Sequence, residues 1–87
     1  MWHEVVWDSE CFEQLQVMVA AGVPPRWLHE TIRVIHDELS SDPSGKGTQL
    51  SEGLRRLDVT PLRAFFHVEQ AEMRVMVDAL WWIGFDA

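Results

Sequence analysis

GLRRLDVTPLRAFFHVEQAEMRVMVDALWWI, the stretch from Gly53 to Ile83, decides the predicted fold of this chain. Two turn signals, Thr60-Pro61 and the polar segment 69–72, separate three runs that are rich in Val, Leu, Phe and Trp. Polar turn residues between β-branched and aromatic runs are typical of consecutive antiparallel strands. The stretch therefore predicts a three-stranded antiparallel meander.

Alternation along the predicted strands assigns their faces, because successive side chains of a strand point to opposite sides. On the middle strand the sets are Leu62, Ala64, Phe66 and Val68, expected on the core face, and Arg63, Phe65 and His67, expected on the other. On the last strand Met73, Val75, Val77, Ala79 and Trp81 alternate with Arg74, Met76, Asp78, Leu80 and Trp82. Both of these sets are largely apolar, so we expect this strand to be central and partly covered on both sides.

The N-terminal half predicts one strand and two helices. The segment 2–7 is aromatic and β-branched, which favours a single short strand. Helical spacing of apolar residues predicts a helix over 9–21 and a second from Pro25 to about Leu39. The segment 40–49 is rich in turn residues and is expected to be a loop. The predicted fold class is α+β: an N-terminal strand, a two-helix hairpin and a three-stranded antiparallel meander, forming one sheet covered by the helices.

Length and composition fit a single domain over residues 1–87. The chain has 87 residues, 47% of them hydrophobic, which is enough for one compact core. No apolar run approaches the roughly 20 residues of a membrane helix, and no signal-peptide pattern is present. The single cysteine, Cys11, excludes an intrachain disulfide and favours a reducing compartment. We therefore expect a soluble, cytoplasmic protein without membrane association.

The formal net charge of −7 argues against tight nonspecific binding of nucleic acid, which requires cations at the contacted phosphates. The basic residues are nevertheless unevenly distributed. Five of the seven lie from residue 46 onward: Lys46, Arg55, Arg56, Arg63 and Arg74. A locally basic sheet on an acidic protein is consistent with this distribution.

Two other motifs carry little functional information. His29 and His36 lie seven residues apart on the second predicted helix, but no third or fourth ligand follows at a recognisable spacing. Lys46 lies in Gly-Lys-Gly-Thr, where the phosphate-binding loop motif would require Ser or Thr directly after the lysine. We expect no metal site and no cofactor.

The order of elements, together with three motifs, resembles the RelE/ParE toxin superfamily of bacterial toxin–antitoxin systems. The motifs are VVWDSECFEQL at the start of the chain, DPSGKG followed by LSEG, and LRRLDVTPLRAFFHV. The resemblance covers residues 2–83. It implies a toxin-like component of a type II system that acts on mRNA in translation or on DNA gyrase, and a cognate antitoxin that neutralises it.

The resemblance also implies roles for individual residues. Arg63 would contact the scissile phosphate, Arg56 would assist it, and His67, on the same predicted face, is the nearby proton carrier. Residues implied or proposed to contact RNA or a protein partner are Lys46, Arg55, Arg74, Trp82 and Phe85. The alternative for the arginines is a solvated sheet face with cross-strand pairs to Asp58, Asp78 or Glu72. Trp81 is expected to close the edge of the core.

A second function remains open on the sequence alone. Ribonuclease relatives carry proton-transfer residues near the C-terminus, where this chain has Trp81-Trp82, and an indole is neither a general acid nor a general base. The chain contains no tyrosine. The alternative is therefore a catalytically silent protein-interaction module of the same fold, binding a peptide or a second copy of itself as a homodimer.

Overall fold

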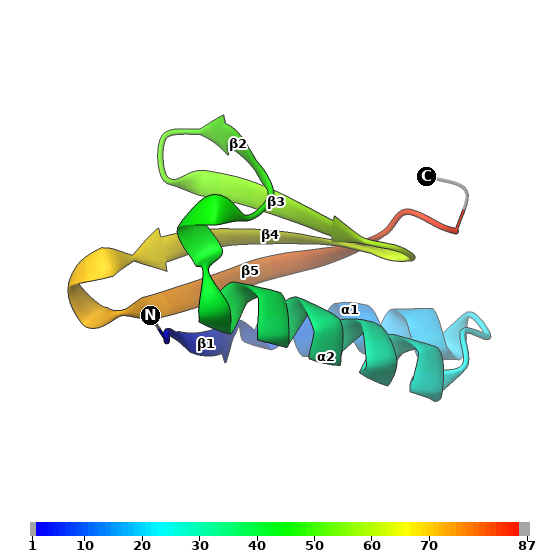
Figure 1. Cartoon of the computed structure of the whole chain (residues 1–87). Coiled ribbons are helices and arrows are strands. Elements are labelled where there is room, and N and C mark those ends of the chain that lie inside the picture. The colour runs from blue at the N-terminus through cyan, green and yellow to red at the C-terminus, as the bar shows by residue number, and fades with distance from the viewer. Residues whose placement is uncertain (1, 86–87) are drawn as a thin grey trace.

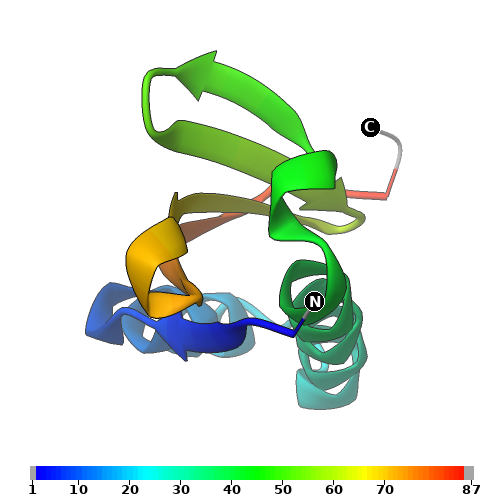
Figure 2. The ribbon, with the colours of Figure 1, turned by 60° about the vertical axis from the view of Figure 1, so that its left-hand side comes forward.

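The computed structural model describes residues 2–85. It consists of one five-stranded sheet and two helices, which lie together against one face of the sheet (Figures 1 and 2). In chain order the elements are β1 (Glu4–Trp7), α1 (Ser9–Ala20), α2 (Pro25–Ser41), β2 (Thr48–Ser51), β3 (Leu54–Val59), β4 (Leu62–Glu69) and β5 (Arg74–Trp82), with short 3-10 turns at Pro43–Gly45 and Gln70–Glu72.

The predicted meander is confirmed as β3, β4 and β5, which pair antiparallel. The strand order is β1-β5-β4-β3-β2, and β1 pairs parallel with β5, so β5 is central as expected. The expected cover on both of its faces is wrong, because both helices lie against the same face of the sheet. The prediction of a loop over residues 40–49 is wrong at its C-terminal end. There β2 begins at Thr48, pairs antiparallel with β3 and adds a fifth strand to the sheet. All four residues of β2 are exposed. Short, exposed and largely polar, this strand lacks the apolar alternation by which strands are recognised.

Both helices begin where the sequence indicates. The Asp8 carboxylate accepts a hydrogen bond from the Glu10 amide at 2.9 Å and caps α1, while Pro25 opens α2, where its missing N–H costs nothing. The face of α2 with Leu28, Ile35 and Leu39 is buried. Neither helix in the described part of the chain has the length and hydrophobicity of a transmembrane span.

The core lies between the helices and one face of the sheet. Its fully buried residues include Phe66 and Leu62 of β4, as the alternation predicts. Burying each such side chain contributes about 1.5–3 kcal/mol of hydrophobic free energy. The remaining buried hydrophobic residues are Cys11, Met18, Leu28, Ile35, Leu39, Ala64, Val75, Val77 and Leu80.

A register shift in β5 overturns the faces predicted for the end of that strand. Phe65 lies opposite Ala79 and Phe66 lies opposite Val77, so Asp78 is an extra residue, a β-bulge. After the bulge Leu80 turns to the core and is 1% exposed. Trp81 moves to the other face and is 54% exposed, so its predicted place at the edge of the core is wrong.

Candidate functional site

The face of the sheet opposite the helices, here called the open face, carries most of the chemically active side chains. The register places Arg56 and Asp58 of β3 on this face, opposite Phe65 and Arg63 of β4. On β4 every second residue from Arg63 lies on the open face, namely Arg63, Phe65 and His67. This is the face that the alternation predicts for these three residues. On β5 the open face carries Arg74, Met76, Asp78, Ala79 and Trp81.

Arg63 is held by a carboxylate on the neighbouring strand. Its Nε and Nη2 donate to the two oxygens of Asp58 at 2.8 and 2.9 Å, a two-point contact. The hydrogen bond from Arg63, together with its charge, lowers the pKa of the Asp58 carboxyl below its usual range. Planar two-point pairs of this kind fix the direction of the guanidinium. An RNA phosphate would have to displace Asp58 before it could contact Arg63 through the same nitrogens.

His67 lies between two carboxylates. Its Nδ1 is 2.9 Å from Asp78 Oδ2, and its Nε2 is 3.6 Å from Glu69 Oε2. The hydrogen bond to Asp78, assisted by both negative charges, raises the pKa of His67 above 6.5. A neutral imidazole donates from only one nitrogen, so the arrangement favours the imidazolium, which donates from both. The two carboxylates thereby favour the protonated form of His67, which can donate a proton but cannot accept one.

Arg74 completes a chain of charges across β4 and β5. Its Nε donates to Glu69 Oε1 at 2.7 Å, and this contact lowers the pKa of the Glu69 carboxyl. Three cations on the open face thus each have a carboxylate partner. Arg56 has no hydrogen bond or ion pair of its side chain among the described residues. Because a strand rises about 3.3 Å per residue, the Cα atoms of Arg63 and His67, four residues apart on β4, lie about 13 Å from each other. The three residues expected to act in catalysis share a face but do not converge on one point.

An aromatic pair continues the open face toward the end of β5. The rings of Phe65 and Trp81 meet edge to face, with centroids 4.8 Å apart and planes at 67°. Such contacts contribute about 0.5–1.5 kcal/mol beyond the burial of the rings. Trp81 was not among the sequence-predicted site residues, because strict alternation placed it on the core face. Only the bulge at Asp78 brings it beside Phe65.

Arg55 and Lys46 lie elsewhere. Arg55 is opposite the buried Phe66 and therefore on the helix side of the sheet, where its guanidinium donates to the Lys46 carbonyl at 3.0 and 3.2 Å. The Lys46 ammonium pairs with Glu38 of α2 at 3.0 Å. Gly47 has a positive φ, and a Cβ there would clash with the Arg56 carbonyl. Two structural contacts thus account for this motif: the backbone of Gly47 lies tightly against that of Arg56, and Lys46 pairs with Glu38 of α2.

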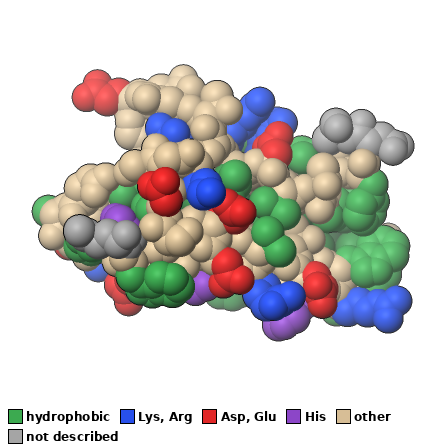
Figure 3. Space-filling view, viewed as in Figure 1, with side chains coloured by type: hydrophobic (Ala, Val, Ile, Leu, Met, Phe, Trp, Pro, Cys, Tyr) green, Lys and Arg blue, Asp and Glu red, His purple; other side chains and the backbone are tan. Residues whose placement is uncertain are grey.

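Trp82 and Phe85 lie at the end of the sheet, where Trp82 pairs with Leu62 and is on the side of the helices, not on the open face. Phe85 contacts both Trp82 and Trp27 edge to face, with centroid distances of 5.8 and 5.4 Å. Phe85 is 57% exposed and Trp82 is 43% exposed. In the view of Figure 3, hydrophobic side chains gather at the right-hand end of the molecule, with acidic and basic side chains directly below them, and a smaller hydrophobic group lies at the lower left. The predicted role of Trp82 and Phe85 in binding a partner remains a prediction.

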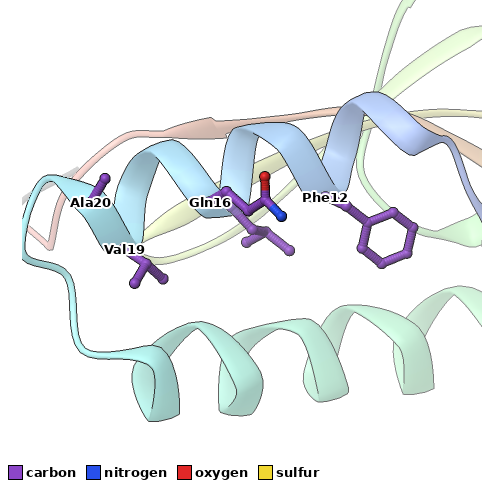
Figure 4. A pocket seen from close by; sticks show the side chains of 5 residues that line it. Phe12, Gln16, Val19 and Ala20 are labelled. Atoms are coloured by element: carbon purple, nitrogen blue, oxygen red, sulfur yellow. The ribbon is translucent and has the colours of Figure 1, made fainter.

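An apolar hollow lies along α1. Phe12, Leu15 and Val19 line it together with Gln16 and Ala20, and its volume is about 450 Å³. Figure 4 shows Phe12 and Val19 extending toward α2. A smaller hollow of about 260 Å³ shares Leu15 and Val19 and continues between the helices. Phe12 is 56% exposed, so this part of the helical layer leaves apolar surface uncovered.

His29 and His36 have no cluster of further ligating side chains around them in the described part of the chain. Within residues 2–85, no three side chains of His, Cys, Asp or Glu are grouped closely enough to hold a metal ion. Cys11 is fully buried under β5, and burial, with the charges of Asp8 and Asp78, raises the pKa of its thiol to about 11. A thiol in that state is protonated at neutral pH and is a weak nucleophile.

The arrangement of elements is similar to that of two solved toxin–antitoxin complexes. A chain of the RelBE2 complex from Mycobacterium tuberculosis superposes with a TM-score of 0.79 at 16% identity, covering 94% of this chain and 92% of that chain. A chain of the chromosomal ParDE system from P. aeruginosa gives a TM-score of 0.65 at 14% identity, covering 94% and 97%. The chain has the RelE/ParE-like toxin fold. At these identities the likeness establishes the fold and assigns no role to any residue.

The likeness to these toxin–antitoxin chains is found in the structure and not in the sequence. No protein-family model matches the chain, and no curated protein sequence is significantly similar to it. The RelE/ParE-like fold therefore rests on the three-dimensional arrangement, which the predicted order of strands and helices anticipated. The fold is shared over nearly the whole length of both compared chains.

Proposed function

We propose that this protein is the toxin-like component of a type II toxin–antitoxin pair and that a cognate antitoxin protein binds it. The observation that carries the proposal is the likeness to chains of two toxin–antitoxin complexes over 94% of this chain. Its target would be mRNA in translation or DNA gyrase, the two targets that the resemblance implies.

Growth of a bacterium that expresses the protein alone tests this proposal directly. We expect growth to stop on induction and to recover when the antitoxin, sought in the reading frame next to its gene, is expressed with it. RNA cleavage in a translating extract and supercoiling by purified gyrase then separate the two targets. Normal growth at high expression, with neither activity affected, would contradict the toxin assignment.

The open face favours an effect through binding over RNA cleavage. Asp58 occupies the two nitrogens of Arg63 that a phosphate would use. His67 is held between Asp78 and Glu69, and no residue of the chain is a tyrosine. These contacts support the second candidate, a catalytically silent module of the same fold that binds protein, as a homodimer or with another chain.

Arg63→Ala separates the two candidates, with Arg33→Ala as the control because Arg33 lies on the exposed surface of α2. If the protein cleaves RNA, R63A abolishes cleavage and growth arrest while R33A preserves both. If it acts only by binding, R63A changes association with its partner and no RNA product forms with any variant. If the unmodified protein cleaves RNA and the R63A variant cleaves it equally well, Arg63 is not a catalytic residue.

A further inference from the structure

The outer side of α2 carries charges of alternating sign at Arg26, Glu30, Arg33 and Asp37. Their spacing places them along one line of the helix, opposite its buried face, and all of them are exposed. This line is called here the α2 stripe. Within it Glu30 and Arg33 contact each other at 3.7 Å, with side chains 71% and 64% exposed. Arg26 and Asp37 form no ion pair within the described chain, so half of the stripe is left for an outside partner.

The α2 stripe is complementary to its own reverse. When two copies of α2 lie antiparallel, Arg26 of each copy faces Asp37 of the other, and Glu30 faces Arg33. When they lie parallel and in register, every charge faces a charge of the same sign. Opposite charges across an interface favour one orientation and exclude others, although each exposed ion pair adds little affinity. The charge pattern therefore favours one occupant, a second copy of α2 that runs the other way.

Apolar surface beside the stripe supplies the attraction. α1 and α2 lie side by side under the sheet (Figure 2), and the hollow of about 450 Å³ along α1 is open to the surface. Phe12 and Val19 extend from α1 toward α2 (Figure 4) and are 56% and 42% exposed. Large exposed apolar side chains that border a hollow are typical of protein–protein contact surfaces. The hollow lacks a side chain that would fill it.

A two-fold axis through the middle of the α2 stripe brings such a side chain to the hollow. Ile32 lies next to the midpoint of the stripe, and Leu15 of α1 lines a common hollow with it, so both lie close to one level of the helical layer. Rotation about this level carries Phe12 of one copy to a place between Gln16 and Val19 of the other. Both of these residues line the larger hollow. One axis thus satisfies the charges of α2 and fills the hollow along α1.

We propose that this chain forms a two-fold symmetric homodimer through the outer surface of α1 and α2. The two copies of α2 run antiparallel and pair their charges, while Phe12 of each copy enters the hollow of the other. The four helices form a layer between two sheets. The open face of each sheet points away from the contact, so the dimer leaves that face free and does not depend on the proposed function.

The size of the contact indicates its strength. Helices of 12 and 17 residues, each about 10 Å wide, present a surface of about 20 Å by about 20 Å on each copy. This area is at the small end of specific interfaces. We therefore expect a reversible dimer with a Kd of about 1–100 μM.

Sedimentation equilibrium of the intact chain measures the dimer. Between about 1 μM and about 500 μM the average mass should rise from that of one chain toward that of two. Phe12→Ala removes the ring that fills the hollow and should raise the Kd at least about tenfold. Val17→Ala is the control, because Val17 is 69% exposed but lies on the flank of α1 toward β5. It should leave the Kd within about twofold.

Two variants with rearranged charges test the antiparallel pairing. Arg26→Asp with Asp37→Arg exchanges the outer charges and keeps every antiparallel pair opposite in sign, so the Kd should stay within about threefold. Arg26→Glu with Glu30→Arg also conserves the net charge, but it sets like charges against each other in every pair. Its Kd should rise at least about tenfold. All substituted positions are exposed, and far-UV circular dichroism checks that each variant is folded.

A mixing experiment tests whether the two stripes face each other. Arg26→Glu with Arg33→Glu leaves only negative charges on the stripe, and Glu30→Lys with Asp37→Lys leaves only positive ones. Each variant should be monomeric alone, and their equimolar mixture should form a heterodimer at least as stable as the unmodified homodimer. Each variant changes the net charge of −7 by four, so both remain negative and attract each other only at the stripe.

Glu52→Lys with Glu72→Lys is the matched control for the positive variant. It adds the same charge on the two turns of the sheet that flank β3 and β4, and it should still form its own homodimer. If this control dissociates as the positive variant does, net charge and not the stripe governs assembly, and the inference fails.

Three other results would overturn the inference. They are a monomer at about 1 mM protein, equal dimerisation of the two rearranged variants, and a dimer that Phe12→Ala leaves unchanged. These outcomes are independent of the growth test. Growth arrest by a chain that stays monomeric would remove the dimer alone, and a dimer without any effect on growth, translation or gyrase would remove the toxin assignment alone.

Discussion

Arg63 and Asp58 lie directly opposite each other on β4 and β3 and are joined by two hydrogen bonds, at 2.8 and 2.9 Å. The residue that the resemblance assigns to a phosphate is therefore already satisfied by a carboxylate of its own sheet. This pair determines what a ligand on the open face must do, because it must either replace Asp58 or use groups other than the Arg63 Nε and Nη2.

Removing the guanidinium should restore an ordinary titration of Asp58. The contact lowers the pKa of this carboxyl from 3.8, so Asp58 stabilises the fold above pH 3.8 and the stabilisation is lost as the pH falls through its lower folded value. Arg63→Ala should raise the Asp58 pKa toward 3.8, as measured by carboxyl ¹³C NMR. Arg63→Lys, which keeps the charge without the two-point contact, should give an intermediate value. An Asp58 pKa that is the same in all three proteins would contradict the pairing.

Stability should decrease with rising pH through the titration of His67. Its folded pKa is raised above 6.5 chiefly by the hydrogen bond to Asp78, so the stabilisation is complete below pH 6.5 and is lost as the pH rises through the folded value. Asp78→Asn should lower the His67 pKa in an imidazole proton titration and flatten the change in denaturant midpoint between about pH 6 and about pH 8. Glu72→Gln, on the β4–β5 turn, is the control and should leave both unchanged.

Gln14 should stabilise the bulged end of β5. Its side-chain oxygen is the acceptor for the amide of Leu80, a residue that is 1% exposed. Gln14→Ala leaves that amide without a partner and should cost about 1–3 kcal/mol of unfolding free energy, with faster hydrogen exchange at Leu80. Gln14→Glu keeps an acceptor oxygen and should retain the protection. Loss of protection in Gln14→Glu as well, which keeps both the side-chain length and the acceptor oxygen, would contradict the assigned role of this hydrogen bond.

Two neighbouring phenylalanines should respond very differently to truncation. Phe66 is fully buried in the core, whereas Phe65 lies on the open face against Trp81. Phe66→Ala should cost about 3–5 kcal/mol in urea unfolding, and Phe65→Ala clearly less, because only the first opens a cavity. Phe65→Ala should instead change the near-UV signal of Trp81. Equal losses of stability would place both rings in the core and contradict the register of β4.

Cys11 should react only when the protein opens. Its thiol is buried and its pKa is raised to about 11, chiefly by that burial. We expect labelling by a thiol reagent at neutral pH to follow the unfolding rate and to accelerate with denaturant. Val17→Cys in a Cys11→Ala background provides a 69% exposed thiol that should react at once. Rapid labelling of native Cys11 would show that α1 detaches from β5 without global unfolding.

Much of the fold followed from local pattern. Turn residues at Thr60-Pro61 and a helix-breaking Gly22 marked the boundaries, and the alternation of β4 assigned Phe66 to the core and Arg63 to the open face. β2 was missed because its four exposed residues carry no apolar alternation. The bulge at Asp78 was missed because residues on both faces of β5 are largely apolar, so shifting the register by one leaves the pattern unchanged.

The sequence by itself determined the element order, the core face of β4 and the resemblance to RelE/ParE-like toxins, since these depend on local propensity and on the spacing of apolar residues. Only the tertiary structure decided which charges neutralise one another and which tryptophan is exposed. Pairing of Arg63 with Asp58 depends on the register between strands, and exposure of Trp81 depends on one extra residue in β5. Both are set by contacts between strands, and a one-residue shift there reverses the face of every side chain that follows.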